Sequence, residues 1–214
     1  MEEIDLLHHT LRTFQTQVGD NKDHPVHSRN KFNKQFGMLL RDWNYLKIIS
    51  HRIESTDSNE ATILALDLKS LYVFGRVFSE SVLYTSSLFV TSSSKIRWKK
   101  IGEFVDSTER NIEFEPDQMK AFWAAVGGSI QLLNKTFKYR NEVLHEKESN
   151  TEWTFAWPGH SNLDNVRIAN VPWPEDADKK REVRTLNARS LLQTLANEVP
   201  KVFDYLCSFG AQGT

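Results

Sequence analysis

Residues 31–53, KFNKQFGMLLRDWNYLKIISHRI, decide the fold class, because their apolar positions recur every three or four residues. This spacing places the apolar side chains on one face of an α-helix, which turns once in about 3.6 residues. The same periodicity is present in residues 4–18, 58–89, 116–147 and 186–206. The sequence therefore predicts an all-α fold, a bundle of four to five helices.

The period changes between the fourth of these helices and the last. Trp153, Phe155 and Trp157 alternate with small or polar residues, and apolar residues alternate again after a Pro-Gly pair. Alternation of this kind is typical of short strands. We therefore expect a small β-hairpin, inserted at residues 151–175 before the last helix of a single domain that spans residues 1–214.

Composition limits the classes of protein to which the chain can belong. It contains 27 Lys plus Arg and 28 Asp plus Glu, so its overall charge does not hold it on a polyanion. Its one cysteine, Cys207, can form no intramolecular disulfide and is too few for a structural zinc site. No apolar run reaches about 18 residues, and the acidic start is unlike a secretory signal. We expect a cytoplasmic protein with no membrane span, no metal and no other cofactor.

One run of side chains is a candidate active site: RNEVLH, at residues 140–145. Asn141 and His145 are four residues apart and share a helical face, and the long Arg140 side chain can reach along the helix toward them. A guanidinium pairs with phosphate through two parallel hydrogen bonds, and an imidazole exchanges protons near neutral pH. These groups suit RNA cleavage without a metal, in which the ribose 2′-hydroxyl attacks its own phosphate.

The expected roles follow from that chemistry. His145 acts as general base or acid, Arg140 stabilises charge on the phosphorus, and Asn141 supports them. The structural alternative is a solvated helix end, where basic groups complement the helix dipole and pair with neighbouring glutamates.

The run resembles the motif of the HEPN superfamily, in which Arg is followed by four to six residues and then His, at the end of a long helix. The resemblance implies a homodimer that joins two copies of Arg140 and His145 in one metal-independent ribonuclease site for single-stranded RNA. It also implies a toxin or antiviral defence role, with an antitoxin or regulatory protein as partner. One branch of the family has Tyr two positions after the His, and this chain departs from it with Lys147.

A second run mixes cations with an aromatic residue: Lys95, Arg97, Lys99 and Lys100 surround Trp98. Such a surface can hold a phosphate backbone and stack a base, so we expect it to bind RNA. The alternative is a solvated basic loop with its aromatic side chain in the core. The rival function is a catalytically silent bundle that binds RNA or a protein partner through these same surfaces.

Two smaller features of the helices bear on the site. Ser79, Glu80 and Ser81 interrupt an otherwise apolar helix, and they either face the helix of the candidate motif or face solvent. The pair Gly127-Gly128 predicts a close helix crossing, because glycine lets another chain approach the backbone.

Overall fold

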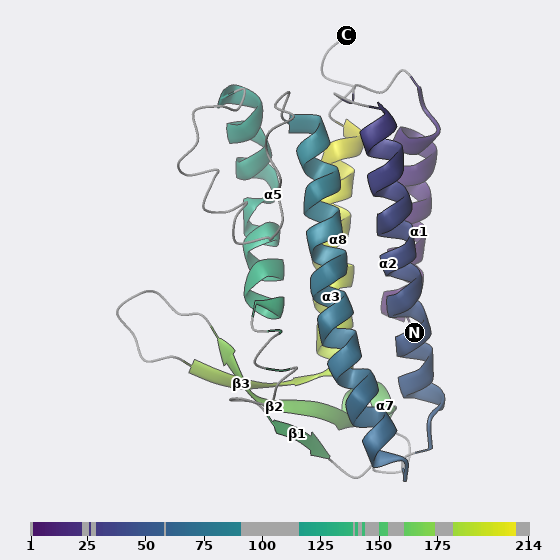
Figure 1. The fold of residues 1–214 in the computed structure, drawn as a ribbon. Coiled ribbons are helices and arrows are strands. Elements are labelled where there is room, and N and C mark those ends of the chain that lie inside the picture. The colour runs from purple at the N-terminus through teal and green to yellow at the C-terminus, as the bar shows by residue number, and fades with distance from the viewer. Residues whose placement is uncertain are drawn as a thin grey trace.

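The computed structural model describes residues 2–22, 26, 29–57, 59–90, 116–138, 140, 143, 150–153, 161–173 and 182–208. Within these ranges the main helices are α1 (Glu2–Phe14), α2 (Arg29–Ser55), α3 (Ala61–Val90), α5 (Pro116–Phe137) and α8 (Ala188–Ser208). Figure 1 shows them side by side, with a small sheet across one end. The predicted all-α bundle is confirmed. None of the described helices is both long and apolar enough to cross a membrane.

The central element is α3, which packs against α2, α5 and α8 (Figure 1). Its pairing with α2 is antiparallel, since Asp42 in the middle of α2 contacts Ser81, whereas Arg52 further along α2 contacts the earlier residue Asp67 of α3. A helix enclosed in this way must be apolar on most of its faces. That requirement explains the long apolar sequence of α3.

Aromatic side chains join four helices in one part of the core. The Phe14 and Phe203 rings stack with centroids 4.3 Å apart, and the Phe32 and Phe89 rings meet edge to face at 5.6 Å. Phe14 also contacts Phe36 at 5.5 Å. These rings come from α1, α2, α3 and α8, so this cluster alone holds four helices together through large apolar surfaces.

The sheet has three antiparallel strands in the order β1 (Asn150–Trp153), β2 (Val166–Trp173) and β3 (Glu182–Asn187). β1 and β2 form the predicted hairpin, and β3 adds a strand after it. An irregularity in the β2–β3 register falls near Asn170, whose φ of 54° is a backbone conformation that asparagine tolerates better than most residues.

Two predicted element boundaries were wrong. Leu186 belongs to β3, where it pairs with Ile168, and not to the last helix. The last helix begins at Ala188 because the Asn187 side chain accepts a hydrogen bond from the Ser190 backbone nitrogen at 2.7 Å, as an N-cap does. The fourth helix, predicted to run to residue 147, ends at Phe137. Of the alternating aromatics, Phe155 and Trp157 lie outside the described residues.

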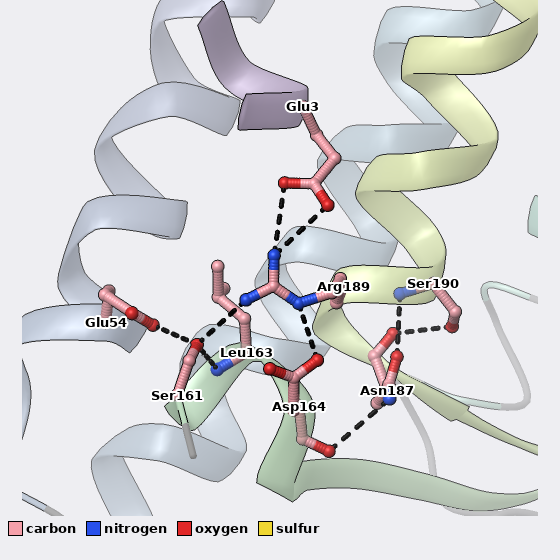
Figure 2. Close-up of polar contacts among 8 residues, drawn as sticks. All are labelled: Glu3, Glu54, Ser161, Leu163, Asp164, Asn187, Arg189 and Ser190. Atoms are coloured by element: carbon pink, nitrogen blue, oxygen red, sulfur yellow. Dashed lines mark hydrogen bonds and ion pairs between the residues drawn. The ribbon is translucent and has the colours of Figure 1, made fainter. Parts of the chain in front are cut away.

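A polar network fastens α1 to the start of α8 (Figure 2). Arg189 Nε donates to Asp164 at 2.5 Å, and its Nη1 pairs with Glu3 at 3.2 Å. Its Nη2 donates to Ser161 Oγ at 3.3 Å, and that hydroxyl donates to Glu54 at 2.6 Å. One guanidinium therefore joins α1, α8 and the short helix α7 (Asn162–Asn165), and reaches α2 through a serine.

Among the described glycines, the one that lies closest to another helix is Gly75 of α3, and not the glycine pair of α5. A Cβ at position 75 would meet the Phe137 ring, with Cζ only 2.9 Å away. At Gly127 the only close group among the described residues is Trp123 of the same helix, and around Gly128 that part of the chain leaves open space. Gly75 therefore allows α3 and α5 to pack closely.

Gly75→Ala should destabilise the protein although alanine is the better helix former. Overpacking against Phe137 costs about 1–3 kcal/mol, more than the gain of about 1 kcal/mol in helix propensity. Gly37 is the matched control: it is exposed within α2, with nothing within 4 Å of an added Cβ. Gly37→Ala should raise the free energy of unfolding in urea, and Gly75→Ala should lower it. Equal stabilisation by both would contradict the close contact.

Glu3→Gln should destabilise the protein by about 1–2 kcal/mol at pH 7, because a charged partner of Arg189 is lost. Burial acts to raise the Glu3 pKa, but hydrogen bonds from its own backbone and from Arg189 outweigh it, so the pKa lies below 4.5. The ionised form is thus stabilised in the folded state. The difference between wild type and variant should persist above about pH 4.5 and shrink as pH falls further.

Urea unfolding measured from pH 7 to pH 3.5 tests this dependence, with the exposed neighbour Glu2→Gln as control. A difference that does not vary with pH would show that the Glu3 charge contributes nothing.

Candidate active site

Arg140 lies three residues after the end of α5. Its backbone is helical and its side chain is partly buried, and Val143 is also helical and fully buried. Asn141 and His145 lie outside the described residues. The convergence of these three polar side chains on one phosphate therefore stays a prediction. The expected RNA-binding residues also lie outside the described ranges: Lys95, Arg97, Trp98, Lys99 and Lys100.

Two side chains from other elements donate hydrogen bonds to the C-terminal end of α5. The last carbonyl groups of a helix have no partner within the helix itself. The Thr136 carbonyl accepts hydrogen bonds from the Tyr72 hydroxyl at 2.8 Å and from Arg184 Nη2 at 3.2 Å. Tyr72 belongs to α3 and Arg184 to β3. One carbonyl thus joins three elements immediately before the candidate motif.

Arg184 stays cationic at neutral pH in surroundings that disfavour its charge. Burial lowers the pKa of its guanidinium to about 10, and the nearby Tyr72 opposes that shift. A group with that pKa is almost fully charged at pH 7. Its positive charge at the C-terminal end of α5 complements the negative end of the helix dipole.

A second polar contact joins α3 to α5 shortly before this end. The buried Arg76 donates from Nη1 to Asn134 Oδ1 at 3.0 Å and from Nε to Glu80 Oε1 at 2.8 Å. A buried charge is tolerated when it is paired and hydrogen-bonded. Glu80 therefore supports Arg76 in a position from which it holds α5.

The polar residues expected to interrupt α3 point to three different partners. Ser79 Oγ donates to the Gly75 carbonyl of its own helix, and Ser81 Oγ donates to Asp42 of α2. Glu80 alone of the three acts toward α5, through Arg76. Sequence reasoning missed Tyr72, Arg76 and Arg184, since their partners are far away along the chain.

Two further features are weaker candidates for chemistry. Burial, with a contribution from Asp204, raises the pKa of the Cys207 thiol to about 11, and a thiol that is protonated at neutral pH is a poor nucleophile. A cavity of about 220 Å³ between α1 and α2 is lined by His8, Arg12 and Trp43 among others. Figure 1 places those two helices on the opposite side of the bundle from α5.

No group of three or more His, Cys, Asp or Glu within the described ranges is arranged to hold a metal ion.

Comparison with known proteins identifies no relative: the chain matches no family model, no curated protein and no solved structure.

Tyr72→Phe should lower the free energy of unfolding by about 1 kcal/mol, because the buried Thr136 carbonyl loses one of its two donors. Urea unfolding followed by circular dichroism measures the change. Tyr45→Phe is the matched control, since Tyr45 is 42% exposed and should respond by less than about 0.5 kcal/mol. If the two variants are equally stable, the Tyr72 hydroxyl does not hold the end of α5.

Proposed function

We propose that this protein is a metal-independent endoribonuclease of the HEPN type that cleaves single-stranded RNA at a site shared by two copies of the chain. The observation that carries the proposal is the RNEVLH run at residues 140–145, which follows a helix of an all-α bundle. Arg140 and His145 are the central residues and Asn141 assists them. A toxin or antiviral defence role, with a regulatory protein as partner, follows from the same family resemblance.

The arrangement around Arg140 is compatible with this role. Arg140 follows a helix end that Tyr72 and Arg184 hold, so its backbone starts from a fixed point. A cation that stabilises a transition state acts best when it is already positioned before the reaction. The buried Val143 further ties this part of the chain to the core.

The proposed reaction needs no group beyond the protein and the RNA. The ribose 2′-oxygen attacks the adjacent phosphorus while a general base accepts its proton. The bond from phosphorus to the 5′-oxygen breaks, and a general acid protonates that leaving oxygen. The products are a 2′,3′-cyclic phosphate and a 5′-hydroxyl. DNA has no 2′-hydroxyl and should resist cleavage.

Labelled single-stranded RNA, incubated with the purified protein in excess EDTA, should be cleaved, whereas its DNA counterpart should not. His145→Ala and Arg140→Ala should each reduce the rate by about 100-fold or more, as expected for loss of acid-base or charge-stabilising groups. His51→Ala and Arg12→Ala are the matched controls, because both residues are exposed on other helices. These controls should cleave at the wild-type rate.

Three results would overturn the proposal: cleavage unchanged in His145→Ala, cleavage that EDTA abolishes, or no cleavage by the wild type. RNA binding without cleavage would support the rival function, a silent binding bundle. Light scattering should also give the mass of a dimer, because the proposed site needs residues from two chains.

A further inference from the structure

One exposed face of α2 carries cations and apolar side chains in a single line. Successive members are three or four residues apart, so they lie within an arc of about 100° around the helix. All of them are exposed. We name this face the α2 stripe, and it consists of Lys31, Lys34, Met38, Arg41, Tyr45, Ile48 and Arg52.

The Arg41 guanidinium is held at the surface by a carboxylate beneath it. Arg41 Nε and Nη2 donate to Asp42 Oδ1 at 3.3 and 3.1 Å, and Ser81 Oγ donates to Asp42 Oδ2 at 2.6 Å. The Arg41 side chain is 55% exposed, whereas that of Asp42 is only 3% exposed. Within the described part of the chain Nη1 of Arg41 makes no hydrogen bond, so its two hydrogens are available to another acceptor.

Arg52 repeats this arrangement three turns further along α2. Its Nη2 lies 3.0 Å from Asp67 Oδ1, again with an exposed guanidinium above a buried carboxylate. Burial raises the pKa of Asp67 while Arg52 opposes the shift, and Asp67 Oδ2 has no hydrogen-bond partner among the described residues. Burial of this carboxylate is therefore unfavourable. The contact that Asp67 does make holds the Arg52 guanidinium in position.

Exposed apolar groups lie between the two arginines. The Tyr45 ring, 42% exposed, rests against Phe74 of α3 with centroids 5.0 Å apart, and Ile48 is 53% exposed. A ring that is supported on one side and open on the other can stack an unpaired base. Arg41 and Arg52 are 11 residues apart, about 16 Å along the helix axis.

The charges of the stripe favour an anionic partner over a second copy of the chain. The acidic residues of α2 are Asp42 and Glu54. Asp42 is buried, and Glu54 accepts a hydrogen bond from Ser161 away from the stripe. Two copies facing each other here would bring cations together, which disfavours association.

We propose that the α2 stripe binds single-stranded RNA, with its cations on the phosphates and Tyr45 stacked on a base. The proposal deepens the proposed ribonuclease function and rests on it, since it assigns a surface that holds the RNA strand away from the reacting bond, on the side of the bundle opposite α5 (Figure 1). Cations interleaved with an exposed ring suit a single strand, because bases in a duplex are not free to stack on protein.

Binding of a labelled 20-nucleotide RNA, measured by fluorescence anisotropy, tests the stripe separately from cleavage. All variants carry His145→Ala so that no RNA is cut. Lys31→Gln with Lys34→Gln, and Arg41→Gln with Arg52→Gln, should each weaken binding about tenfold or more. The logarithm of the association constant falls linearly with the logarithm of the salt concentration. Each pair should make this slope shallower by about 1.4, which corresponds to two lost phosphate contacts on a single strand. Tyr45→Ala should weaken binding about tenfold.

The control pair is Arg12→Gln with Lys47→Gln, which removes the same charge away from the stripe and should bind within about twofold of the parent. The lysine pair keeps the test valid even if the arginine pair unfolds, since neither lysine makes an ion pair among the described residues. Melting temperatures confirm which variants are folded.

Unchanged RNA affinity in the folded stripe variants overturns this inference, and so does binding to vesicles of phosphatidylserine and phosphatidylcholine without binding to RNA. If the stripe variants lose affinity but the wild type cuts no RNA, the α2 stripe is an RNA-binding surface and the ribonuclease proposal fails. If the wild type cuts RNA and the stripe variants bind RNA normally, the ribonuclease proposal is supported and the RNA-binding role of the α2 stripe is overturned.

Discussion

The close approach of α3 and α5 at Gly75 fixes the position of the helix that precedes the candidate motif. The Phe137 ring occupies the space that a Cβ at position 75 would need. About one turn earlier on α3, the Tyr72 hydroxyl donates to the Thr136 carbonyl at 2.8 Å. The last turn of α5 is thereby fixed against α3. Arg140 comes three residues after this turn, whose position the core of the bundle determines.

The polar groups inside α3 restrict how its neighbours can pack. Apolar surfaces tolerate small shifts, because their attraction is not directional. The contact of Arg76 with Asn134 and that of Ser81 with Asp42 are directional and involve buried charge. A helix that slid or rotated by one residue would break these hydrogen bonds to charged groups, at a cost of about 1.5–3 kcal/mol each. We infer that such contacts select one arrangement of α2, α3 and α5 from several with similar apolar burial.

The sequence predicted what depends on local pattern and missed what depends on distant partners. The helices were predictable because their buried positions repeat every three or four residues. Leu186 was misplaced because a short apolar segment suits a helix as well as a strand, and its pairing with Ile168 decides the outcome. No glycine or proline marks the end of α5, which depends on Tyr72 and Arg184, 64 and 48 residues away from Thr136. The contiguous motif at residues 140–145 was visible, but its supports were not.

The ion pairs of Arg41 with Asp42 and of Arg52 with Asp67 add little to the stability of the fold. Exposed pairs contribute about 0–1 kcal/mol, and burial of a carboxylate costs several. Asp42 and Asp67 are nevertheless buried beneath Arg41 and Arg52, whose side chains are each 55% exposed. The two carboxylates restrict the positions of both guanidinium groups in the free protein. A phosphate that binds there orders less of the protein, so more of the contact energy remains as affinity. Arginines fixed in this way suit a surface that holds an RNA strand in one register, which a site cutting a single bond requires.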